Sequence, residues 1–149
     1  RLAEPVTDVG AAQLHLDGDE ANRIVKIVGK GATGTGASGH DPKGPNRTEL
    51  RRAFNKVTSS HERWFCYVFD EPEGALPLEG IGGNGDSGSP VLMEVGGQWQ
   101  VAGLMAWKFA AGDFRTSRPG RYGQANCNVR LAHYASWIEG VIGGRAVGN

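Results

Sequence analysis

A short stretch in the second half of the chain combines a potential nucleophile with the small residues that such a group needs around it. Residues 83–92 read GNGDSGSPVL, so glycines flank the pair Asp86-Ser87 and an apolar run follows at once. A serine hydroxyl attacks a carbonyl only after a base has taken its proton, and the oxyanion that forms must meet fixed hydrogen-bond donors. The amides of Gly85 and Ser87 could be those donors, because glycine places no side chain in the way of the reacting carbonyl.

The residues that follow predict a β-hairpin that would hold this stretch in place. Residues 90–95 and 98–107 are two apolar runs joined by Gly96-Gly97, and a glycine pair supplies the positive φ angles of a hairpin turn. Ser87 would then lie at the entry to a core hairpin. An ordinary tight turn between strands is the competing interpretation of the small residues. If that turn is buried, the carboxylate of Asp86 needs a cationic partner.

The remaining sequence predicts an all-β domain closed by one helix. Glycine accounts for 24 of the 149 residues and proline for 7, which indicates many turns between short strands. Residues 23–28 and 64–69 are rich in β-branched and aromatic side chains and predict strands, whereas residues 48–54 fit either a short helix or the start of a strand. An amphipathic helix is expected over residues 131–142, where the apolar residues that recur at helical spacing are Leu131, Tyr134, Ala135, Ile138, Val141 and Ile142.

Length and charge exclude several classes of protein. A chain of 149 residues fits one domain with a single core. Its 16 basic and 16 acidic residues balance, so neither nucleic acid nor a membrane surface is expected as a partner. No apolar run approaches the roughly 20 residues of a membrane helix, and residues 1–6 lack the features of a signal peptide, so any targeting segment is expected to lie outside the chain. Neither a cofactor nor a metal is predicted.

A second glycine pattern follows the first predicted strand. Residues 29–34 match G-x-G-x-x-G, which suggests a dinucleotide site only when a helix comes next. Further glycines, together with Pro42 and Pro45, break the chain where that helix would have to be. We therefore expect a flexible surface loop.

Residues 85–90, GDSGSP, resemble the nucleophile motif of the chymotrypsin/trypsin family of serine endopeptidases. Residues 101–107 are similar to the substrate-binding strand of that family, residues 134–138 to its C-terminal helix, and residues 1–6 to the segment that follows its catalytic aspartate. The resemblance spans nearly the whole chain. It implies a chymotrypsin-like antiparallel β-barrel with a closing C-terminal helix, in which residues 1–149 form the C-terminal half of the protease domain.

The resemblance also implies a division of catalytic roles. Ser87 would be the nucleophile, the amides of Gly85 and Ser87 would form the oxyanion hole, and Asp86 would pair with the N-terminal amine that zymogen cleavage releases. In this family the catalytic histidine and aspartate precede the present segment, so they would come from an N-terminal half, in the same precursor or in a separate chain. Loss of the base costs several powers of ten in turnover. The chain alone is therefore expected to be essentially inactive.

The four histidines of this chain do not replace the family's base. His15 is expected in a strand of alternating apolar and polar residues, His40 in the glycine loop, His61 in a polar turn and His133 on the closing helix. None has the small-residue, cysteine-flanked setting that marks the base in the family. Each is therefore expected to be an ordinary surface or core-edge histidine.

The resemblance places the specificity pocket around Ile81, six positions before the serine, with Ala106, Trp107 and Lys108 on its wall. An isoleucine at the floor argues against a preference for Arg or Lys and favours an apolar or small side chain of a peptide or protein substrate. Two alternatives stay open. The glycine-rich spacing could slip and bring Glu79 to the floor, and Lys108, where the family usually has glycine, could narrow or cap the pocket.

Cys66 and Cys127 are the two cysteines of the chain, and their numbers alone allow either one disulfide or two buried thiols. By the family resemblance they would lie on neighbouring strands, so a bond between them is a hypothesis that a Cα separation above about 7 Å would exclude. The resemblance also implies a secreted or extracytoplasmic protein.

Two other functions compete with the protease. One is a catalytically dead, protease-like binding module. The absence of the base and the presence of Lys108 favour this alternative, whereas the intact GDSGSP motif argues against it. The other is a non-catalytic β-domain with a chance turn, which leaves the hairpin and the closing helix unexplained together. A partner or a dimer is expected because the surface meant for the missing half would be apolar and exposed.

Overall fold

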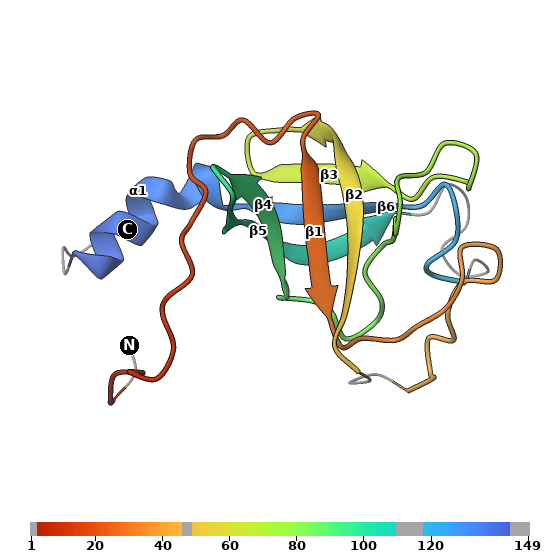
Figure 1. Cartoon of the computed structure of the whole chain (residues 1–149), viewed down its shortest axis with the longest axis horizontal. Coiled ribbons are helices and arrows are strands. Elements are labelled where there is room, and N and C mark those ends of the chain that lie inside the picture. The colour runs from red at the N-terminus through yellow and green to blue at the C-terminus, as the bar shows by residue number, and fades with distance from the viewer. Residues whose placement is uncertain (1–2, 46–48, 110–117, 144–149) are drawn as a thin grey trace.

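The computed structural model describes residues 3–45, 49–109 and 118–143, with the backbone alone over residues 107–109. The fold is all-β and consists of a closed antiparallel barrel and a short C-terminal helix (Figure 1). This is the architecture expected of a chymotrypsin-like barrel with a closing helix. The strands are β1 (Ile24–Gly29), β2 (Arg51–Ser60), β3 (Trp64–Val68), β4 (Pro90–Val95), β5 (Gln98–Phe109) and β6 (Ala125–Arg130), and they close in the order β1-β2-β3-β6-β5-β4.

Alternation of side chains along the strands builds the core. Val25 and Ile27 of β1 point inward and are buried, while Lys26 between them is only half-buried. Phe65 and Tyr67 of β3 are buried in the same alternating way, so a core strand forms over residues 64–68 of the predicted 64–69. The core formed in this way comprises Val25, Ile27, Val57, Phe65, Tyr67, Val91, Met93, Ala102 and Met105.

The predicted hairpin is confirmed as β4 and β5. Val95 pairs with Gln98, and the intervening Gly96 and Gly97 have φ angles of 58° and 79°. Of the ambiguous residues 48–54, residues 51–54 belong to a strand, because β2 starts at Arg51 and runs to Ser60 with β1 on one side and β3 on the other. The sequence pattern indicates only the beginning of this long strand.

A disulfide joins Cys66 of β3 to Cys127 of β6. The two residues face each other directly in the strand pairing, with their Cα atoms 4.1 Å apart. The hypothesis of a bond between them is therefore confirmed. It closes a loop across 61 positions of sequence that contains the candidate nucleophile.

The closing helix differs from its prediction in two ways. Its first turn is a 3-10 helix, η1 (Leu131–Tyr134), and the α-helix α1 (Ala135–Ile142) follows. No residue of α1 is buried, and Trp137 and Ile142 are 56% and 78% exposed. In Figure 1, α1 extends away from the barrel rather than lying against it. The helix is amphipathic, but its apolar side chains do not join the barrel core.

The N-terminal segment is anchored to the barrel at a few points. Residues 3–14 are exposed, and Figure 1 shows their ribbon running away from the barrel on the same side as α1. His15 does not lie in a strand, contrary to expectation, because Leu14 makes only an isolated bridge to Val101. An ion pair of 2.8 Å between the buried Glu20 and the partly exposed Arg130 of β6 fixes the end of the segment. No helix within the described ranges is long and apolar enough to cross a membrane.

Candidate active site

Ser87 lies in a turn that is tied to the second strand of the core hairpin. The N–H of Gly88 donates to the carbonyl of Met105 at 2.8 Å, and the N–H of Met105 donates back to the carbonyl of Ser89 at 2.9 Å. These two bonds hold the turn against β5 just before β4 begins. Ser87 itself is exposed, and its hydroxyl makes no hydrogen bond to any residue that the structure describes.

The backbone amides around Ser87 divide into two groups. Five of them donate hydrogen bonds to groups within the described chain, and these are the amides of Gly83, Asn84, Asp86, Gly88 and Ser89. The amides of Gly85 and Ser87 donate to no described residue. Gly85 has a φ of 97°, which favours glycine. The turn therefore keeps two exposed N–H groups unpaired beside the Ser87 hydroxyl, and these belong to the two residues predicted to form an oxyanion hole.

Asp86 satisfies its buried carboxylate with backbone amides. The residue is 7% exposed, and its Oδ1 accepts the N–H of Gly31 at 2.7 Å while its Oδ2 accepts the N–H of Gly83 at 2.8 Å. No ion pair joins Asp86 to another described residue. Two charge-assisted hydrogen bonds from N–H groups stabilise the carboxylate among the described residues, and its pairing with a cation stays a prediction. Asp86 also lines a cavity of about 300 Å³ together with Gly31 and Ile81.

The G-x-G-x-x-G stretch is the element that reaches Asp86. A Cβ atom on Gly29 would lie 2.1 Å from Oδ1 of Asp86, and one on Gly31 would lie 2.6 Å from all three carboxyl atoms. Both positions therefore need glycine for close approach of the backbone. No helix follows within the described part of the segment, in agreement with the rejection of a dinucleotide site. The segment is not simply a surface loop, because Gly31, Gly36 and His40 are buried.

The four histidines do not contact Ser87. His15 is 1% exposed and its Nε2 lies 2.6 Å from Oδ1 of Asp19, beside Val101 on a different part of β5 from Met105. His133 lies 3.8 Å from Glu62. His40 is 4% exposed, and its Nε2 accepts the backbone N–H of Asn84 at 3.3 Å. His15 and His40 are thus buried rather than surface residues.

The residues predicted for the specificity pocket fall into two groups. Ile81 is half-buried and packs against the barrel core, and Ala106 of β5 is half-buried. Trp107 and Lys108 continue β5 opposite Cys127 and Asn126, but their side chains lie outside the described part of the structure. Their predicted role on the pocket wall stays a prediction.

Glu79, the alternative residue for the pocket floor, is held in a neighbouring turn. One carboxylate oxygen accepts the N–H of Asp70 and the other accepts the N–H of Leu76, each at 2.7 Å. Both oxygens are thus used to close the turn at residues 70–79. The carboxylate of Glu79 is thus engaged in this turn, and the placement of Ile81 at the pocket floor stays a prediction.

Sequence reasoning missed the residues that brace the nucleophile turn. His40, Ala32 and Gly31 contact residues 84 and 86 across more than forty positions of sequence. The paired glycines at 29 and 31 could have indicated a close backbone approach, whereas nothing local marks His40.

No group of three or more metal-binding side chains occurs among the residues that the structure describes. The chain matches no protein-family model.

Proposed function

We propose that this chain is the C-terminal half of a serine endopeptidase of the chymotrypsin/trypsin type, with Ser87 as its nucleophile. The observation that carries the proposal is the unpaired state of the Gly85 and Ser87 amides within the described chain, beside an exposed serine hydroxyl. A turn that served only to connect strands would have no need to leave two N–H groups free at that position. Preorganised donors of this kind usually supply the largest single stabilisation of an acyl-transfer transition state.

The chemistry follows from these groups. A base removes the Ser87 proton as Oγ bonds to the carbonyl carbon of a peptide, and the carbonyl oxygen becomes an oxyanion that accepts the Gly85 and Ser87 amides. Return of the proton to the leaving nitrogen breaks the peptide bond and leaves an acyl-enzyme, which water then hydrolyses. Since no described histidine contacts Ser87, the base would come from outside these elements, and the chain alone would turn over substrate extremely slowly.

The missing half is proposed as the partner of this chain. Two observations support it. The side chains of α1 are unburied, with Trp137 and Val141 more than half exposed, and the N-terminal segment extends on the same side of the barrel (Figure 1). Apolar surface of this kind indicates a protein contact. An N-terminal barrel that carries the histidine and the aspartate would cover it.

Asp86 would serve as the switch that orders the turn. The carboxylate borders the cavity shared with Gly31 and Ile81, which leaves room for the ammonium group expected from zymogen cleavage.

The disulfide is compatible with an extracytoplasmic location, and we propose that the protein acts there. Its substrate would be a peptide or protein, and the half-buried Ile81 favours an apolar or small side chain at the cleavage site.

Labelling with a serine-directed phosphonate tests the proposal. The probe is added to the purified chain and, separately, to the chain with any polypeptide that copurifies. The intact mass of each polypeptide is then measured under denaturing conditions. We expect one adduct on Ser87 only when a second polypeptide with a histidine and an aspartate is present. Ser87→Ala should abolish the adduct, whereas Ser89→Ala, two positions away, should leave it.

Two results would decide against the proposal. An adduct that survives Ser87→Ala would place the reactive group elsewhere. A complete complex that binds peptides but forms no adduct would favour the binding module, in which the same fold recognises peptides without cleaving them.

A further inference from the structure

Asn84, the residue directly before Gly85, is held by three contacts from one distant segment. That segment comprises residues 29–45 and is called the glycine-rich segment below. The Asn84 N–H donates to Nε2 of His40 at 3.3 Å, the N–H of Ala32 donates to the Asn84 carbonyl at 2.8 Å, and the Asn84 side-chain amide donates to the Pro42 carbonyl at 3.4 Å. The position of the Gly85 amide follows from these contacts, because the Asn84 carbonyl and the Gly85 N–H belong to the same planar peptide group.

We propose that His40 is a positioning residue for the oxyanion hole, active only while its imidazole is neutral. This inference rests on the proposed function in one respect, since the hole has a purpose only if Ser87 is a nucleophile. The contact itself does not depend on that function. His40 touches neither substrate nor Ser87, and acts through the backbone of Asn84.

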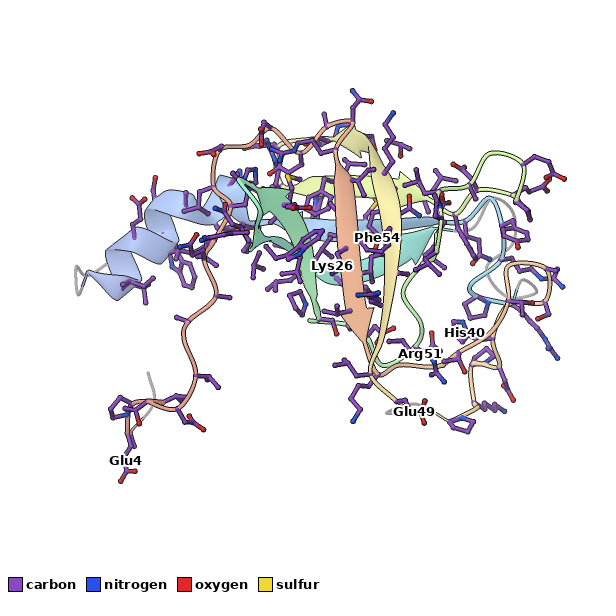
Figure 2. The ribbon with its side chains drawn as sticks, in the orientation of Figure 1. Glu4, Lys26, His40, Glu49, Arg51 and Phe54 are labelled. Carbon is purple, nitrogen blue, oxygen red and sulfur yellow. A yellow bond between two sulfur atoms is a disulfide. The ribbon has the colours of Figure 1, made fainter. Side chains whose placement is uncertain are left out.

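The surroundings of His40 keep its ring in place. The residue is 4% exposed, and its backbone N–H donates to the carbonyl of Pro119 at 2.8 Å. A Cβ atom on Gly120 would lie 2.8 Å from Nδ1 of His40, so this neighbour must be glycine for the ring to fit. Figure 2 shows His40 outside the barrel, beyond the end of β1 and on the same side as Arg51. A ring packed in this way holds Nε2 toward Asn84 rather than turning to solvent.

Charge on the ring decides whether the contact exists. A neutral imidazole accepts through Nε2 when its proton is on Nδ1, whereas an imidazolium has protons on both nitrogens and accepts nothing. Acidification therefore turns the His40–Asn84 contact from attraction into a clash of two donors. A histidine with an unperturbed pKa changes charge between about pH 5 and pH 8, and this is the range that the titration below covers.

Among the residues that the structure describes, four other charged or titratable groups lie near His40. Glu79 lines a small cavity with His40, and its oxygens accept the amides of Asp70 and Leu76. Asp86 lies beyond Asn84 and accepts the amides of Gly31 and Gly83. Asp41 follows His40 in sequence, and the Cβ of Arg118 lies beside Gly39. The two carboxylates of the neighbouring elements are thus engaged with backbone amides, and the Asn84 N–H is in direct contact with the His40 ring.

A magnetic-resonance titration of the ¹⁵N-labelled chain tests the inference without any turnover. The amide signals of Asn84, Gly85 and Ser87 and the ring nitrogens of His40 are followed from about pH 8 to pH 5. We expect the three amides to shift with the midpoint of the His40 ring, while the hairpin amides of Gly96 and Gly97 stay constant. Amide shifts that stay constant while the His40 ring titrates would overturn the proposal. A ring that stays neutral over the whole pH range would overturn it as well.

Two variants separate positioning from folding. His40→Gln places an uncharged acceptor near the position of Nε2, so the neutral-pH amide shifts should persist at low pH. His40→Ala removes the acceptor, and the Asn84 amide should exchange with solvent about tenfold faster. His61→Gln, at an exposed histidine, is the matched control and should change none of these signals. Equal effects of His40→Gln and His40→Ala would show that the ring only fills space.

The outcomes distinguish this inference from the proposed function. If the amide shifts follow the titration of His40 but no phosphonate adduct forms in the complete complex, the His40–Asn84 contact positions the turn and the protease proposal fails. If the adduct forms and its rate has the same pH dependence in wild type and His40→Gln, the protease proposal stands and His40 has no positioning role. Amide shifts that follow His40, together with an adduct rate that falls on acidification in the wild type but not in His40→Gln, would establish both the protease and the positioning role of His40.

Discussion

The N–H of Gly31 donates to Oδ1 of Asp86 over 2.7 Å, although the two residues are 55 positions apart in sequence. The bond joins the glycine-rich segment to the turn that carries Ser87. It also explains why a buried carboxylate persists without a described ion-pair partner, since the N–H of Gly83 completes its coordination from within the turn. The shape of the nucleophile turn is therefore set from outside the turn.

Gly31→Ala should destabilise the fold by about 1–3 kcal/mol, because the new methyl group would overlap the Asp86 carboxyl group. A Cβ atom at residue 31 would lie 2.6 Å from that group, which is too close for an ordinary contact. Urea unfolding measures the change in free energy. Gly74→Ala is the control, since its nearest neighbour would be 3.9 Å away, and it should be neutral or slightly stabilising. Equal effects of the two substitutions would contradict the role assigned to Gly31.

Reduction of the disulfide should lower the free energy of unfolding by about 2–4 kcal/mol, because the unfolded chain regains the freedom of the loop between Cys66 and Cys127. These are the only cysteines in the sequence, so a reductant has no other disulfide to act on. The Cys66→Ala/Cys127→Ala double variant should show the same loss without reductant and no further response when reductant is added. Unfolding midpoints that agree with and without reductant in the wild type would refute this expectation.

Tyr67 should make the fold sensitive to alkali. Burial raises the pKa of the Tyr67 phenol well above its usual range, and the nearby charge of Asp86 adds to the effect. Since the folded state holds this proton more tightly than the unfolded state, its contribution to stability is complete below about pH 10 and is lost as the pH rises further. Absorbance of ionised tyrosine should therefore report at most two of the three tyrosines before unfolding begins.

Tyr67→Phe tests the same side chain. The buried hydroxyl makes no hydrogen bond of good geometry within the described residues, although the Asn128 side chain lies near enough to interact with it. Its removal should therefore change stability at neutral pH by less than about 1 kcal/mol. The variant should also resist alkali better than the wild type. A large loss of stability at neutral pH would reveal a hydrogen bond that the described contacts do not include.

The exposed apolar face of α1 should make the isolated chain associate. Trp137 and Ile142 are 56% and 78% exposed, and burying them in a contact is favourable. The Trp137→Lys/Ile142→Lys variant should sediment as a monomer at concentrations where the wild type forms larger species. Leu50→Lys, at a residue 72% exposed before β2, is the control. A wild type that stays monomeric throughout would count against α1 as a contact surface.

The sequence by itself determined the local elements and the nucleophile turn. A continuous run of aromatic and β-branched residues marked β3. Two apolar runs around Gly96-Gly97 marked the β4-β5 hairpin, because hairpin pairing joins neighbours in sequence. The small residues around Ser87 likewise indicated unobstructed amides. Burial on a period of two and the positive φ of glycine are properties of short stretches, so no tertiary information was needed.

Only the tertiary structure decided which distant residues meet. Asp86 pairs with Gly31, Asn84 with His40, and Cys66 with Cys127 because the closed barrel brings their segments together. The helix α1 carries a regular apolar pattern, yet that pattern does not say whether its face packs on this barrel or on another protein. Contacts across many positions depend on the order of strands in the barrel, and that order leaves no mark in the spacing of nearby residues.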